Sequence, residues 1–349
     1  MKIGTREIGP GHPCYIVAEL SANHGGSFDQ SVAILNAMKE SGADAVKVQT
    51  YTADTLTIPS RKEPFVVGGG TLWDGRTLHD LYQQASMPWE WQPRLQQIAA
   101  ELGMDFFSTP FDDSSVDFLE AMQVPVHKVA SFELVDLPLL RKIAATGKPI
   151  IMSTGMATLA EIQEALDTLR GAGSGPVALL KCTSAYPAAP EEMNLRTIPD
   201  MAARFGVPVG LSDHTMGHVV PVAAVTLGAC IVEKHFILSR STPGPDSTFS
   251  MEPEEFRTMV DAIRVAEQAL GRVNYEVSTK EAKSRVFRRS LFVTADVKAG
   301  GPFTPANVRC IRPAHGLHPR HLEEVLGGVA SQDIEAGTPL DWNLLRKTT

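Results

Sequence analysis

Two histidines and three lysines stand at the ends of short apolar segments of this sequence. His214 and His235 close or nearly close the segments VGLSDH and IVEKHF, and Lys47, Lys128 and Lys181 lie in comparable segments. Two imidazoles, completed by oxygen ligands, suit a borderline cation such as Mn²⁺, Zn²⁺, Fe²⁺ or Co²⁺. Ammonium groups that converge on one point bind a small polyanion. The same pattern also fits two core histidines bonded to the backbone and a lysine that faces solvent.

Carboxylates, hydroxyls and amides end the same segments. Glu19 and Glu133 can donate or accept protons if their pKa values are raised, and His24 is a further candidate metal ligand. The remaining polar ends are Gln49, Thr109, Ser131, Ser153, Thr154, Ser212 and Glu233. Together these groups suit a phosphorylated enol and a carbonyl compound, the latter polarised by a metal acting as a Lewis acid. The chemistry indicated is carbon–carbon bond formation rather than hydride or phosphoryl transfer.

A closed parallel barrel would bring these segment ends together. Eight short β-rich runs alternate with amphipathic stretches, which is typical of repeated βαβ units. The runs begin at Tyr15, Ala45, Phe106, His127, Ile150, Ala178, Val209 and Ile231. Eight such units close a TIM (β/α)8 barrel, whose active sites lie at the carboxyl ends of the strands. The alternative, an open doubly wound sheet, usually has a G-x-G-x-x-G turn after its first strand, and AELSANHGGS lacks that spacing.

Strand geometry predicts which of the polar ends lie together. Neighbouring strands are about 4.8 Å apart, so His214 and His235, on the seventh and eighth runs, can reach one ion. Side chains two residues apart on a strand share a side. The pairs expected on this basis are Lys47 with Gln49, Ser131 with Glu133, Ser212 with His214, and Glu233 with His235.

The pattern divides the chain into a barrel domain (residues 1–275), a basic polar linker (276–289) and a small domain of short β-like runs (290–349). Between the second and third runs, residues 55–91 are rich in Gly, Pro and Trp. We expect them to form a long loop over the barrel mouth, because long loops in compact domains are usually lids or binding loops. The tryptophans there, Trp73, Trp89 and Trp91, either contact a ligand or only pin the loop.

Bulk composition excludes several classes of protein. The 349 residues carry 32 Lys and Arg against 40 Asp and Glu, a net charge of −8 that argues against a broad nucleic-acid surface. No stretch is long and apolar enough to span a bilayer, and the first residues do not follow the pattern of a signal peptide. The four cysteines are scattered. We expect reduced thiols in a cytoplasmic protein.

At these residues the sequence resembles the sialic acid synthase family. The shared motifs, in the family's order, are IVAELSANHGGS, VKVQT, STPF, KVASFE, STGMA, LLKCTSAYP, GLSDHT, EKHF and PGPDSTFS. The last sixty or so residues resemble the antifreeze-like (SAF) domain, with the family's IRP-x-x-G motif around Arg312. The resemblance covers nearly the whole chain. It implies a barrel followed by a β-rich SAF domain, and the condensation of phosphoenolpyruvate with an N-acetylated amino sugar, with release of phosphate.

The resemblance also implies roles for individual residues. His214 and His235 would bind a divalent metal, with Mn²⁺ expected first and Co²⁺ or Mg²⁺ as alternatives. The catalytic groups would be Glu19, Glu133 and Lys47. The substrate-binding residues would be Gln49, Thr109, Lys128, Ser131, Ser153, Ser184, Tyr186, Ser212, Asp246 and Arg312. Ser184 departs from the family's N-acetylneuraminate synthases, which carry Asn there. Arg312 would reach into the barrel of a partner subunit in a domain-swapped homodimer.

Two segments are most similar to the subgroup of this family that makes pseudaminic acid. They are GGGTLWDGRTLHDLYQQASMPWEW and CTSAYP-x-x-x-EEMNL. That subgroup uses 2,4-diacetamido-2,4,6-trideoxy-altrose, whose second acetamido group and missing 6-hydroxyl suit an aromatic lid. We therefore expect this sugar as the substrate. N-acetylneuraminate or legionaminate synthesis by the same chemistry is the alternative, and a non-catalytic carbohydrate-binding protein is the alternative from another class.

Overall fold

The computed structural model describes residues 1–68, 70 and 73–347. The chain forms two compact units, Met1–Gly271 and the residues from Arg272 onward. Among the described residues of the first unit, eight parallel strands close into a barrel in the order β10-β3-β4-β5-β6-β7-β8-β9. The barrel strands are β3 (Tyr15–Glu19), β4 (Ala45–Thr50), β5 (Asp105–Pro110), β6 (His127–Val129), β7 (Ile150–Ser153), β8 (Val177–Cys182), β9 (Val209–Asp213) and β10 (Ile231–His235). The predicted barrel and its strand order are confirmed.

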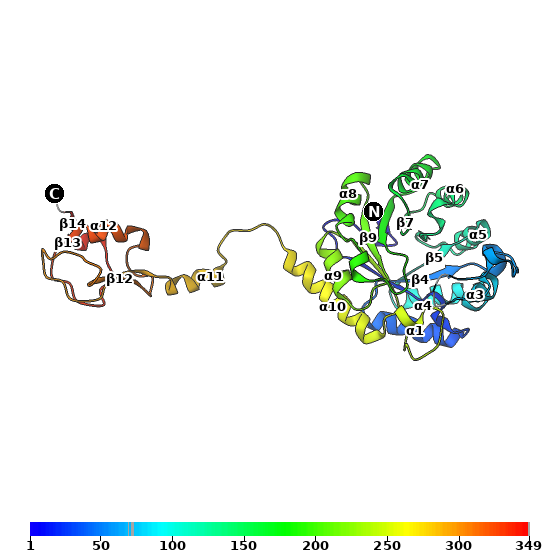
Figure 1. Ribbon diagram of the computed structural model, residues 1–349, viewed down its shortest axis with the longest axis horizontal. Helices are drawn as coiled ribbons and strands as arrows, with labels where there is room; N and C mark the ends of the chain where they lie inside the picture. The colour runs from blue at the N-terminus through cyan, green and yellow to red at the C-terminus, as the bar shows by residue number, and fades with distance from the viewer. Residues whose placement is uncertain (69, 71–72, 348–349) are drawn as a thin grey trace. The chain divides into compact units, whose positions relative to one another are not determined.

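Helices surround the barrel strands, as Figure 1 shows. They are α1 (Phe28–Glu40), α4 (Gln92–Glu101), α5 (Asp113–Ala121), α6 (Leu137–Ala144), α7 (Leu159–Gly171), α8 (Thr197–Phe205), α9 (Val219–Thr226) and α10 (Pro253–Leu270). Polar side chains start several of these helices. Ser27, Asp112 and Thr158 each accept a hydrogen bond from a backbone N–H of the first turn, which satisfies donors that the helix itself leaves unpaired.

The two ends of the barrel interior differ in chemistry. At the amino end, a hairpin of β1 (Lys2–Ile3) and β2 (Arg6–Glu7) brings Ile3 against the inward-facing Tyr15 and Val17. Further inward-facing apolar residues are Ala45, Phe107, Val126, Ile151, Ala178, Leu180 and Ile231. Polar side chains replace these apolar ones toward the carboxyl ends of the strands. The barrel therefore has an apolar floor and one polar mouth, where barrel enzymes place their active sites.

Gly210 allows the last strands of the barrel to approach closely. A Cβ at this position would lie 2.5 Å from the carbonyl oxygen of Ile231 and 2.7 Å from Leu180 Cδ2. Contacts this short do not occur, so a side chain here would push β9 away from β10. The glycine thus supports the spacing between the strands that carry His214 and His235.

The segment between β4 and β5 is more helical than the sequence indicated. It contains α2 (Ala53–Leu56), a short 3-10 helix (Glu63–Phe65), α3 (Leu78–Ala85) and a second 3-10 helix (Trp89–Trp91). Thr77 caps α3 by accepting a hydrogen bond from the Asp80 N–H, and Leu81 is its buried residue. The prediction of a continuous loop is wrong. The glycines indicated a loop, but a capped amphipathic helix follows them. Gly69, Thr71 and Leu72 of the predicted lid lie outside the described residues.

The second unit is small and rich in β structure. It holds α11 (Thr279–Ser284), α12 (Leu322–Leu326) and two antiparallel strand pairs, β11 (Ser290–Val293) with β12 (Val308–Ile311) and β13 (Gly328–Ala330) with β14 (Leu345–Lys347). Its own core contains Leu291, Val293, Phe303 and Val325. The residues predicted as a linker include α11 and a 3-10 helix, Arg285–Phe287.

Two further features bear on the class of protein. Each of the four cysteines is free, and Cys14, Cys182 and Cys230 are buried. In the part of the chain that the structure describes, the helices are too short or too polar to cross a membrane.

Candidate active site

Two lysines and two glutamates alternate inside the barrel mouth. Lys47 Nζ lies 2.7 Å from Glu19 Oε2 and 3.8 Å from Glu233 Oε1, and Lys128 Nζ lies 3.2 Å from the same Glu233 oxygen. All four side chains are buried. Gln49 donates a hydrogen bond to Glu19 at 3.0 Å. The barrel thus brings two ammonium groups close together and pairs them with two carboxylates.

Both burial and the neighbouring charges shift the pKa values of the groups in this cluster. Burial opposes the charge on Lys47, but the Glu19 and Glu233 carboxylates outweigh it and raise the pKa of Lys47. Burial lowers the pKa of Lys128, and the charge of Lys47 adds to this effect. For Glu233, burial is outweighed by Lys128 and Lys47, which lower its pKa. Lys128 is therefore the cation in this cluster that gains most from an incoming anion.

Hydroxyl groups also line the barrel mouth. Lys47 donates to Thr109 Oγ1 at 3.4 Å, and Ser131 Oγ accepts a hydrogen bond from Gly155 N at 3.0 Å. A Cβ on Gly155 would lie 2.3 Å from Ser184 Oγ, so this turn needs glycine to admit the hydroxyl. Within the described residues, the buried Ser153 and Ser184 hydroxyls have no hydrogen-bond partner. Unpaired hydroxyls at the same end of the barrel as two buried lysines are suited to bind oxygens of an anion.

The two predicted metal ligands face each other across β9 and β10. The imidazole centroids of His214 and His235 are 5.5 Å apart. His214 Nδ1 bonds to the carbonyl oxygen of Thr183 at 2.9 Å, which leaves Nε2 toward a ligand. His235 Nδ1 is buried and has no hydrogen-bond partner in the described part of the chain. An orphaned buried imidazole nitrogen beside a second imidazole fits a metal ion.

The protonation of the two histidines and the number of nearby ligands also bear on whether a metal ion fits here. Burial, together with the charges of His214, Lys47 and Lys128, lowers the pKa of His235 well below its usual value, and a metal ligand must be neutral. Burial opposes protonation of His214, but its contacts with Cys182 and Thr183 outweigh burial and raise its pKa. No group of three or more His, Cys, Asp or Glu side chains among the described residues is placed to hold a metal. The protein would thus supply two ligands, and a bound ion would need oxygen ligands from water or substrate.

An aromatic wall stands beside the histidines. The Tyr186 ring is 4.3 Å from the His214 ring and 5.1 Å from that of Phe249. Trp73 extends this wall, with its ring 6.1 Å from Tyr186 and its Nε1 donating to the Pro245 carbonyl at 3.3 Å. This wall gives the mouth a flat apolar side, suited to methyl or acetyl groups.

Two carboxylates complete the mouth. Asp246 accepts hydrogen bonds from the Ser21 hydroxyl and from Ala22 N, and its Oδ2 lies 3.9 Å from His235 Nδ1. Glu133 begins a 3-10 helix after β6, and its Oε2 is buried with no hydrogen-bond partner among the described residues. Burial raises the pKa of Glu133 to about 7. A carboxyl group with such a pKa exchanges protons readily at neutral pH.

The structure brings most of the predicted site residues together but corrects the reasoning for some of them. Ser212 donates to Glu233 at 3.0 Å, as expected for inward-facing neighbours. Ser131 and Glu133 lie beyond the end of β6 at Val129, so strand alternation does not place them. They belong to the turn and the 3-10 helix that follow the carboxyl end of the strand.

Lys181 and His24 do not join the site as the sequence suggested. Lys181 has the same strand parity as the outward-packed Leu179, and its Nζ bonds to the Cys182 carbonyl at 2.8 Å. His24 Nε2 lies 3.1 Å from the carbonyl oxygen of Ala85, and its Nδ1 accepts from Gly26 N. Both histidine nitrogens are therefore engaged by the backbone.

The three tryptophans of the insertion divide between two roles. Trp89 donates to the Tyr51 carbonyl at 3.1 Å, and its ring packs 5.0 Å from that of Phe118. Trp91 packs edge-on against His24 and Phe28. These two pin the segment, and Trp73 is the one of the three that extends the aromatic wall. Arg312 is exposed on the second unit.

Sequence reasoning missed two members of the mouth, Cys182 and Phe249, and placed a third, Glu233, on the inner face without giving it a role. Glu233 bridges both lysines, and its place two residues before His235 is the signal that it faces inward. Cys182 lies with its Sγ 4.0 Å from His214 Nδ1, and although burial opposes it, the contact with His214 lowers the pKa of Cys182 to about 7. Phe249 carries no sequence signal beyond its motif, because its position depends on the loop after β10.

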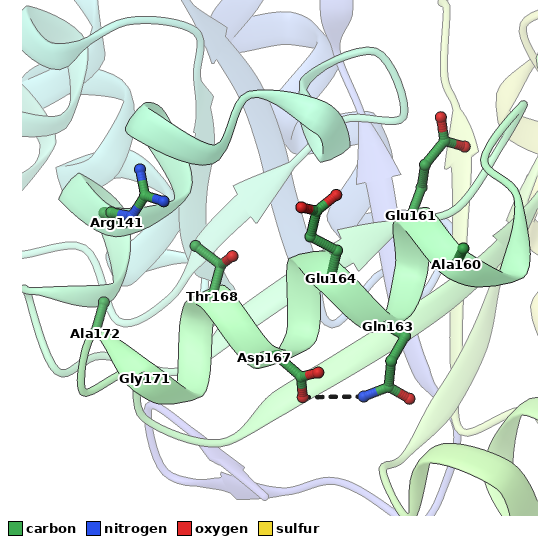
Figure 2. Close-up of a pocket in the computed structure, with 9 residues that line it drawn as sticks. All are labelled: Arg141, Ala160, Glu161, Gln163, Glu164, Asp167, Thr168, Gly171 and Ala172. Atoms are coloured by element: carbon green, nitrogen blue, oxygen red, sulfur yellow. Dashed lines mark hydrogen bonds between the residues drawn. The ribbon is translucent and has the colours of Figure 1, made fainter.

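A separate hollow lies on the outside of the barrel. It has a volume of about 940 Å³ and lies along one face of α7, lined by Glu161, Glu164, Asp167 and Arg141 (Figure 2). Gln163 and Asp167 are hydrogen-bonded there at 2.9 Å, one helical turn apart. None of the predicted site residues lines it.

The fold and the mouth define a barrel enzyme with buried lysines, two imidazoles and an aromatic wall at the carboxyl ends of its strands. The sequence matches the NeuB family over residues 34–275 and the SAF domain over residues 288–346. The chain belongs to the NeuB family. This confirms the resemblance seen in its motifs.

Individual relatives agree with this assignment. The chain is 46% identical to pseudaminic acid synthase of Helicobacter pylori, over 94% of this chain and 96% of that protein. It is 37% identical to N,N'-diacetyllegionaminic acid synthase of Legionella pneumophila, over 97% and 96% of the two chains. The structure of N-acetylneuraminic acid synthetase from Leptospira borgpetersenii, determined with citrate, superposes with a TM-score of 0.72 at 28% identity. It covers 81% of this chain and 94% of that one.

Proposed function

We propose that the chain is a pseudaminic acid synthase. It would condense phosphoenolpyruvate with 2,4-diacetamido-2,4,6-trideoxy-altrose to a nine-carbon 2-keto sugar acid and release phosphate. The observation that carries the reaction type is the buried cluster of Lys47 and Lys128 beside unpaired serine hydroxyls. A buried site with two ammonium groups and free hydroxyls is matched to a small polyanion that carries both phosphate and carboxylate.

The lysines would hold phosphoenolpyruvate in the orientation for attack. In this arrangement Lys128, with Ser153 and Ser184, binds one anionic group, and Lys47 with Thr109 binds the other. The methylene carbon of phosphoenolpyruvate then forms a bond to the aldehyde carbon of the open-chain sugar. The aldehyde oxygen takes up a proton and becomes a hydroxyl group. Water adds to the cationic carbon that results and gives up a proton, and the tetrahedral product loses phosphate as its carbon–oxygen bond to the phosphate group breaks. The protein's main contribution is to position the two reactants and to stabilise charge.

His214 and His235 would hold a divalent metal, for which Mn²⁺ is our first candidate and Co²⁺ or Mg²⁺ are alternatives. A bound metal supplies Lewis-acid polarisation of the sugar aldehyde. The support is the orphaned Nδ1 of His235 and the 5.5 Å between the imidazole centroids. Asp246, held by Ser21 and Ala22 close to His235, would contact the sugar at this side of the mouth.

Glu133 is the carboxylate that we assign to proton transfer with water. Its pKa of about 7 and its unpaired buried Oε2 leave it free to accept a proton. Glu19 is engaged by Lys47 and Gln49 instead. Glu19 would therefore keep Lys47 in place and balance its charge.

The choice of sugar rests on the aromatic wall and on the relatives. Tyr186, Phe249 and Trp73 offer flat apolar area to the second acetamido group and to C6, which is a methyl group in the absence of the 6-hydroxyl. The identity to the Helicobacter pylori enzyme is 46%, against 37% to the Legionella pneumophila enzyme named for a legionaminic acid. Legionaminate or N-acetylneuraminate synthesis is the alternative that the same mouth chemistry would also serve.

We further propose a homodimer in which the SAF unit of one chain covers the barrel mouth of the other. The rim of the mouth exposes apolar side chains, and such patches mark contact surfaces. These rim residues are Phe132, Val135, Met156, Leu159, Met216 and Val219. Arg312 of the covering unit would then approach the substrate. This arrangement would exclude water from the mouth.

Product analysis tests the proposed function. The full chain is incubated with phosphoenolpyruvate, Mn²⁺ and each of the three candidate sugars, and the product is identified by mass spectrometry while phosphate is measured. We expect a nine-carbon 2-keto acid from the diacetamido-trideoxy-altrose, with one phosphate released per product. Product from another sugar alone would contradict the assignment. Lys128→Met should abolish turnover, whereas Lys142→Met, at an exposed ion pair with Asp117, should leave it unchanged.

A further inference from the structure

Asp213 and Lys234 form an ion pair on the outer side of the barrel wall, behind the two rim histidines. The two residues are register partners on β9 and β10. Lys234 Nζ donates to Asp213 Oδ2, and both side chains are fully buried. Because strand side chains alternate, these two point away from the mouth while the adjacent His214 and His235 point into it. The pair therefore joins β9 to β10 one residue before each of the two histidines.

A second set of contacts closes this pair around His214. Lys234 Nζ also donates to the carbonyl oxygen of Thr215. The Thr215 N–H donates to Asp213 Oδ1 at 3.0 Å, and its hydroxyl donates to Asp213 Oδ2 at 3.1 Å. The residues before and after His214 are thus tied to each other and to Lys234, which directly precedes His235. We call Asp213, Thr215 and Lys234 the strand-end clamp.

Fold stability alone is a weak reason for such a clamp. Taking two charges out of water costs about as much as their attraction returns, so a buried ion pair is often no more stabilising than an apolar pair of similar size. The clamp lies in the layer between strands and helices, where apolar residues such as Leu211 and Val232 otherwise pack. Unlike apolar packing, the ion pair makes directional hydrogen bonds, and these hold the backbone of the turn at Thr215 in place.

We propose that the strand-end clamp is a positioning device for metal binding. It would hold the backbones of His214 and His235 so that both imidazoles meet one ion without further adjustment. This inference rests on the proposed metal site. Two protein ligands leave little redundancy, so a small displacement of either histidine should weaken binding strongly. Groups that orient metal ligands from behind commonly change metal affinity by about 10- to 100-fold when they are removed.

The test is a titration of Mn²⁺ alone into the full chain. The Kd is measured by calorimetry or from the spectrum of free Mn²⁺. The variant is Asp213→Asn with Lys234→Met, which removes both charges and the contact of Lys234 with the Thr215 carbonyl while keeping side chains of similar length. We expect a thermal midpoint close to that of the unmodified chain and a Kd for Mn²⁺ raised about 10- to 100-fold. His214→Ala sets the scale for loss of a ligand. A matched control is Asp44→Asn with Arg264→Met, an ion pair of 3.1 Å at the amino end of the barrel, which should leave the Kd unchanged.

The outcomes separate this inference from the metal proposal beneath it. An unmodified chain that does not bind Mn²⁺ overturns the proposed metal site, and the clamp inference with it. An unmodified chain that binds, with a folded double variant of equal affinity, overturns the clamp inference alone. If the double variant does not fold, Thr215→Val is titrated instead, since it removes the hydroxyl contact with Asp213 and leaves the ion pair in place. There, too, an unchanged Kd contradicts the inference, and the Co²⁺ absorption spectrum should show altered ligand geometry if the inference holds.

Discussion

Lys47 Nζ lies 2.7 Å from Glu19 Oε2, and both side chains are almost completely buried. The two residues face each other across β3 and β4, where they are register partners. A buried ion pair of this kind is costly to break from one side, because the remaining charge loses its partner in a dry environment. Lys47 therefore has two roles to separate: it pairs with Glu19 in the folded barrel, and it would bind an anion in the proposed reaction.

The first prediction separates these two effects. Lys47→Met should destabilise the protein by about 3 kcal/mol, since it leaves Glu19 unpaired. Lys47→Met combined with Glu19→Gln should recover most of that loss. Neither variant should bind phosphoenolpyruvate normally, and we expect its KM to rise about 10- to 100-fold in both. Chemical denaturation and steady-state kinetics measure the two quantities. A double variant with normal KM would show that Lys47 acts only in folding.

The second prediction concerns pH. Burial raises the pKa of Glu133 to about 7, and a general base works only when it is ionised. We therefore expect kcat to be high above pH 7 and to fall as pH decreases through 7. Glu133→Gln should lower kcat by roughly 10²- to 10⁴-fold and remove this acidic limb. Glu164→Gln, on an exposed face of α7, is the control that should retain it. Persistence of the limb in Glu133→Gln would assign the titration to another group.

The third prediction distinguishes the tryptophans of the insertion. Trp73→Ala should raise the KM of the diacetamido sugar about 10-fold and leave that of phosphoenolpyruvate unchanged, because it removes part of the apolar wall. Trp89→Ala should lower the thermal midpoint and leave both KM values unchanged, since Trp89 packs on Phe118 away from the wall. Equal effects of the two substitutions on the sugar KM would remove Trp73 from the account of specificity.

The fourth prediction addresses the proposed domain-swapped dimer. Arg312→Ala and His214→Ala should each be inactive alone. When the two variant chains are unfolded together and refolded as a mixture, a mixed dimer contains one barrel with intact histidines covered by an intact Arg312. Activity should therefore return to a substantial fraction of normal. Mixing His214→Ala with His235→Ala is the control, and it should give none. Full activity of a chain cut after about residue 290 would contradict any role for Arg312 in trans.

The sequence alone determined the barrel, because the signals that specify it are local. Strand runs, amphipathic helices and capping residues such as Ser27 and Thr158 recur in order, and each reports its own segment. The same local signals placed polar residues at strand ends, where a parallel barrel must gather them. His214, His235, Lys47 and Lys128 could therefore be assigned to one face before any contact was known.

Only the tertiary structure decided which of those residues meet. Lys128 points inward and Lys181 points outward. The direction of each depends on where its strand begins and on how the neighbouring residues pack, which the composition of the segments does not show. Glu133 reaches the mouth through a turn, which has no period to read. The pairing of Asp213 with Lys234 joins residues on different strands through a buried contact. Such contacts depend on register and on the close approach of β9 and β10 at Gly210, which are properties of the closed barrel rather than of any one segment.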